Sequence, residues 1–100
     1  MVNLEPIVID GTTFTGITVK LPKTTLIVVA SSKGYIMCGA LDVRLLNEKL
    51  SDRGIVAGKA VGVRTLKELL DAPLAEVTLT AEQYGIREGM SGREALLKMV

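Results

Sequence analysis

The fold is decided at Tyr35-Ile36-Met37-Cys38-Gly39-Ala40-Leu41-Asp42, where the spacing of apolar residues changes from that of strands to that of helices. Before this stretch, short apolar runs alternate with turn residues, which is typical of antiparallel strands. After Gly39, leucines follow at positions 41, 45, 46 and 50, and Asp42 can cap a helix. The sequence therefore predicts an α+β fold, with strands first and strand-helix units afterwards.

The first part of the chain predicts two hairpins. Glu5–Ile9 and Thr12–Leu21 flank Asp10-Gly11, a pair that favours the positive φ angles of a type I′ turn. The apolar phase of the second strand changes at Gly16, which predicts a β-bulge there. After a loop at Pro22-Lys23-Thr24-Thr25, the second hairpin joins 26–31 to 35–38. The first four strands should therefore form antiparallel pairs.

The apolar run Leu26-Ile27-Val28-Val29-Ala30 is unbroken. Strands covered on one face alternate apolar and polar residues, whereas a continuous run is typical of a strand covered on both faces. The sequence therefore predicts two-sided burial for this strand.

The second part predicts short strands between capped helices. Ile55–Ala57 and Glu76–Thr80 read as strands, the latter with Val77 and Leu79 pointing inward. Capping boxes predict the starts of three helices. The first begins at Thr65–Glu68 and ends before Pro73, and the second begins at Thr80–Gln83 and ends at Gly85. The third begins at Ser91–Glu94 and forms a terminal helix from about Gly92 to Val100. The expected order is ββββαβαβαα, a mixed sheet within one domain spanning residues 1–100.

A shift of 20 residues aligns 40–50 with 60–70 and aligns the strands Tyr35–Cys38 and Ile55–Gly58. A repeated strand-turn-helix unit would make these two strands parallel, joined by a right-handed crossover. The alternative is that two amphipathic helices share leucines and a glutamate at such spacing by chance. The helix-cap positions disagree, because Asp42 aligns with Gly62, and this supports the alternative.

Composition narrows the classes of function. The 100 residues are 48% hydrophobic, and 12 Lys and Arg against 11 Asp and Glu give a net charge of +1. Such a charge gives no long-range attraction to nucleic acid or an anionic membrane. The hydrophobic residues exceed what the core of so small a monomer can bury, which favours a homo-oligomer. Histidine and tryptophan are absent, which removes the usual general base and the commonest metal ligand. We therefore expect no nucleic-acid partner, no metal and no cofactor.

The compartment follows from cysteine usage and the N-terminus. The chain has one cysteine, and Met1-Val2-Asn3-Leu4-Glu5 has neither the basic segment nor the apolar core of a signal peptide. The longest strictly apolar run, Leu26–Ala30, is far too short to cross a bilayer, which needs about 20 residues. These features predict a cytoplasmic protein that does not span a membrane.

The chain resembles the YunC-like family, small bacterial and archaeal proteins of unknown function. The resemblance lies in Lys33–Asp42, followed by Ala60-Val61-Gly62-Val63 and Leu69-Leu70, and it extends to both ends of the chain. It includes Glu5-Pro6-Ile7, Lys20–Thr24, Gly85-Ile86, Gly89 and Ala95-Leu96-Leu97. The resemblance implies a stand-alone α+β domain and brings no established activity, cofactor or catalytic residue.

Cys38 is one candidate for chemistry. It lies at the end of a predicted strand, before Gly39 and a helix, where backbone N–H groups and the helix dipole can lower the pKa of a thiol. Without histidine, activation would depend on a cation such as Lys59, Arg44 or Arg64. The alternative is a buried cysteine that packs as a small apolar residue, and this alternative is favoured.

A second candidate is an anion site at the ends of the strands Tyr35–Cys38 and Ile55–Gly58. If these strands are parallel neighbours, their carboxyl ends open into one crevice. Gly39 and Gly58 would allow close backbone approach, and three cationic residues would surround the anion: Arg44, Lys59 and Arg64. Alternatively, the arginines are solvated or paired with Asp42 and Glu68.

Two functions therefore stay open. The first is a homo-oligomeric binding or regulatory domain for a small anionic metabolite. The second is a cysteine-dependent enzyme that uses Cys38. The sequence does not decide whether the protein is an enzyme.

Overall fold

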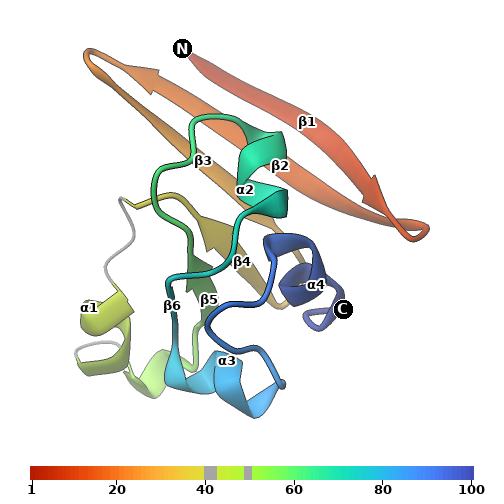
Figure 1. The fold of residues 1–100 in the computed structure, drawn as a ribbon, viewed down its shortest axis with the longest axis vertical. Coiled ribbons are helices and arrows are strands. Elements are labelled where there is room, and N and C mark those ends of the chain that lie inside the picture. The colour runs from red at the N-terminus through yellow and green to blue at the C-terminus, as the bar shows by residue number, and fades with distance from the viewer. Residues whose placement is uncertain (40–42, 49–50) are drawn as a thin grey trace.

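The computed structural model describes residues 1–39, 43–48 and 51–100, and it shows one mixed sheet of six strands in the order β1-β2-β3-β4-β5-β6 (Figure 1). The strands are β1 Val2–Ile9, β2 Thr12–Leu21, β3 Thr24–Ala30, β4 Gly34–Met37, β5 Val56–Lys59 and β6 Glu76–Val77. The helices are α1 Val43–Glu48, the 3₁₀ helix η1 Ser51–Arg53, α2 Leu66–Asp71, α3 Leu79–Gln83 and α4 Gly92–Leu97. The predicted α+β class and element order are confirmed, and η1 is an addition.

The first hairpin forms as predicted at Asp10-Gly11. Asp10 has φ +50° and Gly11 has φ +81°, the signs that a type I′ turn requires. The predicted bulge at Gly16 is wrong, because β1 and β2 pair without interruption from Val2↔Val19 to Ile9↔Thr12. Gly16 instead makes room for the inner packing, since a Cβ there would lie 2.7 Å from Ile7 Cδ1 and 2.9 Å from Leu66 Cδ1.

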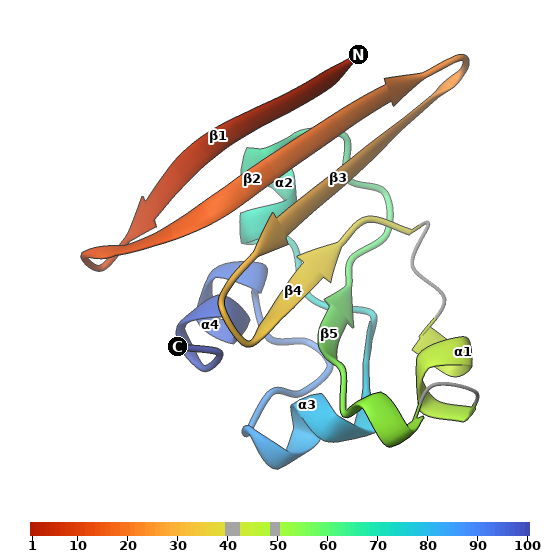
Figure 2. The same cartoon turned by 180° about the vertical axis from the view of Figure 1, so that it is seen from behind.

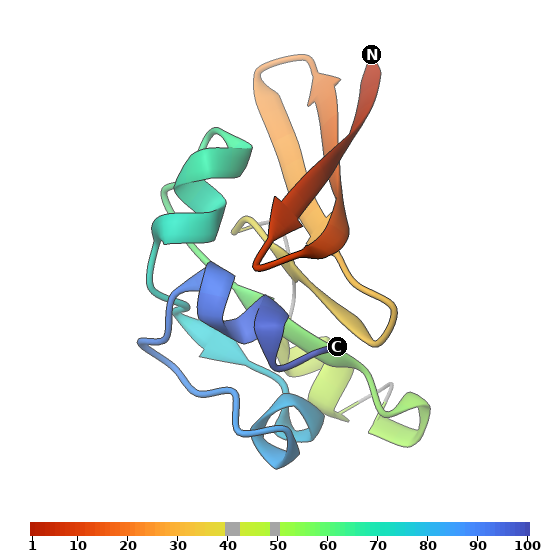
Figure 3. The same cartoon turned by 90° about the vertical axis from the view of Figure 1, so that its right-hand side faces the viewer.

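The strand register divides the sheet into two faces. The inner face carries Phe14, Ile27, Val29 and Ile36, each at most 2% exposed, and α2 and α4 pack against it. Figure 3 shows both helices on one side of the sheet. The inner face therefore holds the main hydrophobic core.

The opposite side of β1–β3 is here called the outer face. By register it consists of the even positions of β1 and β3 and the odd positions of β2. No described helix or loop covers it, as Figures 2 and 3 show from two directions. The predicted two-sided burial of Leu26–Ala30 is therefore wrong for the single chain: Ile27 and Val29 are buried, but Leu26, Val28 and Ala30 stay partly exposed.

The outer side of β4 and β5 is covered by α1. Val43 and Leu46 of α1 form a small cluster with Ala57 of β5, and Tyr35 and Met37 of β4 pack against it. The predicted cap of this helix, Asp42, lies outside the described residues. Since α2 packs on the inner face, the helices that follow β4 and β5 lie on opposite sides of the sheet.

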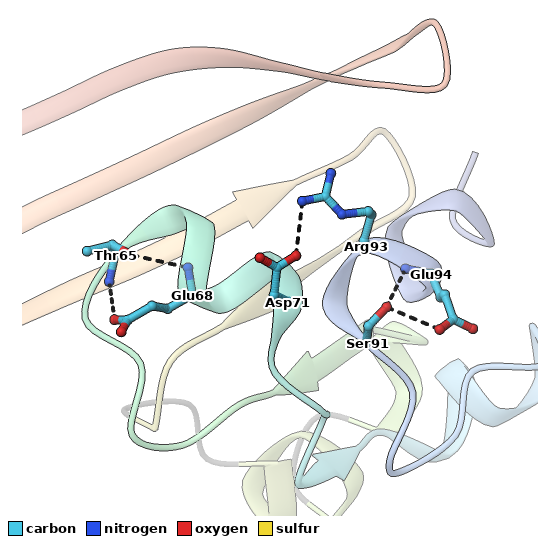
Figure 4. Close-up of polar contacts among 6 residues, drawn as sticks. All are labelled: Thr65, Glu68, Asp71, Ser91, Arg93 and Glu94. Carbon is cyan, nitrogen blue, oxygen red and sulfur yellow. Dashed lines mark hydrogen bonds and ion pairs between the residues drawn. The ribbon is translucent and has the colours of Figure 1, made fainter.

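Two predicted helix starts are confirmed (Figure 4). The backbone N–H of Glu68 donates to Thr65 Oγ1 at 3.1 Å, and that of Thr65 donates to Glu68 Oε1 at 3.2 Å, which completes a capping box. Ser91 caps α4 by accepting from the Glu94 N–H at 3.2 Å. The terminal helix ends at Leu97 and not at Val100.

The predicted boundary between β6 and α3 is wrong. The strand ends at Val77, and the N-cap of α3 is Thr78 and not Thr80. Thr78 is 2% exposed, and its Oγ1 accepts from the Ala57 and Ala81 N–H groups and donates to the Ile55 carbonyl at 2.7 Å. These bonds start the helix early, so Leu79 is 60% exposed although the sequence pattern placed it inward.

Candidate functional site

The strands at the predicted crevice are parallel neighbours. β4 and β5 pair from Gly34↔Val56 to Met37↔Lys59, so their carboxyl ends lie together, and Figure 2 shows the two arrows side by side. The chain leaves β4 toward α1 on the outer side and leaves β5 toward α2 on the inner side. The two connections therefore leave the paired strand ends on opposite sides of the sheet, but the strand order does not reverse here as it does at the topological switch points where open α/β sheets bind ligands.

The predicted residues at these strand ends are engaged in contacts within the chain. Lys59 Nζ forms an ion pair with Glu76 Oε1 at 3.2 Å, and its side chain is only 19% exposed. Gly58 faces the core, where a Cβ would lie 2.8 Å from Leu74 Cδ1. Gly39 is exposed, with Val61 Cγ1 at 3.6 Å from the position of a Cβ.

Arg64 lies in a different place from Lys59. It lines a hollow of about 510 Å³ at the turn between β2 and β3, together with Leu21, Lys23, Thr24, Thr25 and Val63, and Lys59 is not among these residues. The backbone N–H of Arg64 donates to Glu68 Oε1 at 2.8 Å, which fixes the loop before α2. The Arg44 side chain lies outside the described residues, so it is placed in neither site.

The Lys23–Arg64 hollow, as we call it, is cationic. Its lining contains two positively charged residues and two threonines, and no carboxylate from the residues that the structure describes. In the part of the chain that the structure describes, the ion pairs are Lys59–Glu76 and Arg93–Asp71, and neither involves Lys23 or Arg64. Both cations are therefore available to an anion.

Lys23 was missed by sequence reasoning, which assigned it to a loop. It follows Pro22, whose ring fixes φ at about −65°, and its own φ is +62°. A proline followed by a residue at positive φ forms a type II turn, in which glycine or asparagine is usual at the second position. The sequence signal that could have pointed to Lys23 as a site residue was therefore the turn Pro22-Lys23, which has lysine at the position where glycine is expected.

Cys38 is buried. It is 5% exposed and belongs to the main core cluster, and its backbone N–H donates to the Ile27 carbonyl at 3.1 Å. A thiol that reacts with a substrate has to be reachable from solvent. This burial favours the packing role of Cys38.

Within residues 1–39, 43–48 and 51–100, no group of three or more His, Cys, Asp or Glu side chains is arranged to hold a metal ion. Among the same residues, no helix has the length and apolar character needed to span a bilayer.

Comparison with known proteins places the chain in a family. The model of a domain of unknown function, DUF1805, matches residues 37–99. The chain belongs to the DUF1805 family. The matched region contains Cys38, Lys59 and Arg64, whereas Lys23 lies before it.

Two relatives of this DUF1805 chain extend the likeness over its whole length. An uncharacterized protein, YunC, from Bacillus subtilis (strain 168) is 70% identical over 100 residues, which are 100% of this chain and 99% of the relative. The crystal structure of a protein of unknown function, TA1206, from Thermoplasma acidophilum has a TM-score of 0.89 at 30% identity, covering 100% of this chain and 94% of that one. The resemblance to the YunC-like family is thereby confirmed.

Proposed function

We propose that this DUF1805 chain is a homo-oligomeric binding or regulatory domain for a small anionic ligand, which binds in the Lys23–Arg64 hollow. One observation carries the proposal: among the described residues, Lys23 and Arg64 line the same hollow without an ion-pair partner, and no carboxylate lines it. The proposal retains the predicted ligand class, a small anion, and retains Arg64 as a binding residue. Lys23 takes the role that the sequence analysis gave to Lys59 and Arg44.

The chemistry of the lining fits a phosphate or a carboxylate. The guanidinium of Arg64 presents paired N–H donors that match two anion oxygens, and Lys23 adds a point charge. Thr24 and Thr25 are consecutive residues of β3, so their hydroxyls stand on opposite faces of the sheet and only one of them can donate into the hollow. A volume of about 510 Å³ lies within the usual range for small-molecule sites, roughly 300 to 1,000 Å³.

The backbone of Lys23 supports a role for its side chain. A residue other than glycine at positive φ costs roughly 1 to 2 kcal/mol. A lysine at φ +62° therefore lowers the stability of the turn relative to glycine. Strain of this kind gathers at sites where the side chain has a function.

The alternative, a cysteine-dependent enzyme, lacks such support. Cys38 lies in the core at 5% exposure, and Lys59, the neighbouring cation considered for its activation, is paired with Glu76. We therefore propose no catalytic role for Cys38.

Thermal unfolding with inorganic phosphate, small di- and tricarboxylates and nucleoside monophosphates tests the proposal. An anion at about ten times its Kd should stabilise the fold by about 1.4 kcal/mol, which raises the Tm by roughly 5 °C or more. The variant Lys23→Gly/Arg64→Gln removes both charges and relieves the turn, so it should fold and lose the ligand-induced rise.

The matched control is Arg87→Gln/Lys98→Gln, which removes two exposed cations outside the hollow and should keep the rise. The proposal fails if no anion raises the Tm of the wild-type protein, or if the Lys23→Gly/Arg64→Gln variant responds as the wild type does.

A further inference from the structure

The outer face of β1–β3 carries no charge. The even positions of β1 and β3 and the odd positions of β2 are all apolar residues or threonines. At its centre lie Leu4, Ile17, Val19 and Val28, and the register sets Leu4 opposite Ile17 and Ile17 opposite Val28. An apolar row thus crosses three strands.

This face is open to solvent in the single chain. Leu4 is 69% exposed, Val8 65% and Val2 63%, and the apolar side chains of β2 and β3 on this face are partly exposed. The inner face of the same strands contains Phe14 and Val29, which are at most 2% exposed. Soluble monomers rarely expose a continuous apolar patch of more than a few hundred Å².

We infer that a second copy of this chain covers the outer face, so that two sheets pack face to face in a dimer. This inference deepens the self-association named in the proposed function. The outer face and the Lys23–Arg64 hollow share Leu21 and Thr24, but the inference rests on the apolar row at the centre of the face and not on the two cations. A two-fold dimer needs a patch that matches itself. A face without charges meets this condition, because its burial brings no like charges together and removes no charge from water.

The size of the face also fits. The strands contain 7 to 10 residues, and with about 3.3 Å per residue and about 4.8 Å between strands the flat footprint is roughly 400 Å². The side chains standing on it raise the accessible area toward the roughly 800 Å² per partner of a standard stable interface. Two such sheets would pack about 10 Å apart, as in a β-sandwich.

The sequence of β3 agrees with this arrangement. Its unbroken apolar run is typical of a strand covered on both faces, and the single chain covers only one. A second copy provides the missing cover. A lipid surface is less suitable, because membrane-binding faces combine apolar residues with Lys and Arg, and the outer face has none.

Sedimentation of the full chain from low to high micromolar concentration tests the inference. We expect the wild type to sediment as a dimer, and Leu4→Lys and Thr15→Lys to weaken dimerisation by at least about tenfold, since each places two like charges in the interface. Leu79→Lys is the matched control, because Leu79 is a 60% exposed leucine on α3, outside the outer face. It should dimerise as the wild type does.

Circular dichroism shows whether each variant folds. Thr15 is exposed on the outer face, so lysine is tolerated there even if Leu4→Lys were to unfold. A wild type that is monomeric throughout overturns the inference, as does a dimer that Thr15→Lys leaves intact. Binding of a monomer to phosphatidylcholine vesicles would also overturn it.

The anion proposal is tested separately. Lys23→Gly/Arg64→Gln should dimerise like the wild type, because neither residue belongs to the charge-free row of Leu4, Ile17 and Val28. A variant can therefore lose the dimer and still bind the anion, or lose the anion and still dimerise. A failure of the dimer inference is thus distinguishable from a failure of the anion proposal.

Discussion

Leu74 occupies the space that a side chain at Gly58 would fill, since a Cβ on Gly58 would lie 2.8 Å from Leu74 Cδ1. Leu74 is 2% exposed and belongs to the main core cluster, and Gly58 pairs with Val77 at the edge of the sheet. The glycine at the end of β5 therefore allows the segment after α2 to pack onto the strand.

Gly58→Ala should lower the free energy of unfolding by about 1 to 3 kcal/mol, because the added methyl group overfills a closed part of the core. Gly39→Ala is the control at the end of the neighbouring strand. Its Cβ would lie 3.6 Å from Val61 Cγ1, in ordinary contact, so we expect a change within about 0.5 kcal/mol. Urea unfolding measures both, and equal stability of the two variants would contradict the packing role of Gly58.

Thr78→Val should destabilise the protein by about 1 to 3 kcal/mol, because the Ala57 and Ala81 N–H groups and the Ile55 carbonyl lose their partner while buried or partly buried. Thr80→Val is the matched control at the position where the sequence placed the cap. It should change the stability by less than about 0.5 kcal/mol. A larger loss from Thr80→Val than from Thr78→Val would show that α3 starts at the later residue.

Cys38→Ala should fold and cost roughly 1 to 2 kcal/mol, the loss expected when a small buried side chain is trimmed in a core. In the native wild type, we expect iodoacetamide to modify the thiol far more slowly than in urea-unfolded protein, because the folded core excludes the reagent. Equal rates in the folded and unfolded states would restore the nucleophile hypothesis.

Local signals predicted most of the fold. Asp10-Gly11 favoured one turn type, and the side chains of Thr65 and Ser91 cap their own helices, so each feature needs only neighbouring residues. The parallel pairing of β4 and β5 was also predicted, from the 20-residue shift between the two strand-helix segments. The turn and cap predictions rest on chemistry that depends little on the rest of the chain, whereas the parallel pair was predicted from an internal repeat.

Long-range contacts decided the features that were missed. The phase change at Gly16 indicated a bulge, but β2 runs unbroken and is apolar on both faces, with Phe14 inside and Ile17 outside. Thr78 caps α3 and not Thr80, because its hydroxyl also bonds to β5 and to Ile55, more than 20 residues away. These hydrogen-bond partners are distant in the chain, so the local spacing of residues does not predict them.

The candidate site was only partly predictable for the same reason. Arg64 and the choice of an anion came from the sequence, but Lys23 reaches the same hollow from the turn between β2 and β3. The two residues are far apart in the chain and come together only in the folded sheet. No local sequence pattern therefore indicated that Lys23 and Arg64 line the same hollow.

Titration of the ¹⁵N-labelled protein with inorganic phosphate, followed by amide chemical shifts, tests the anion site most directly. We expect saturable shifts centred on Lys23, Thr24, Thr25 and Arg64, which are absent in Lys23→Gly/Arg64→Gln and retained in Arg87→Gln/Lys98→Gln. Shifts centred on Gly39 and Lys59 would place the anion at the ends of β4 and β5, and the absence of any saturable shift would contradict anion binding.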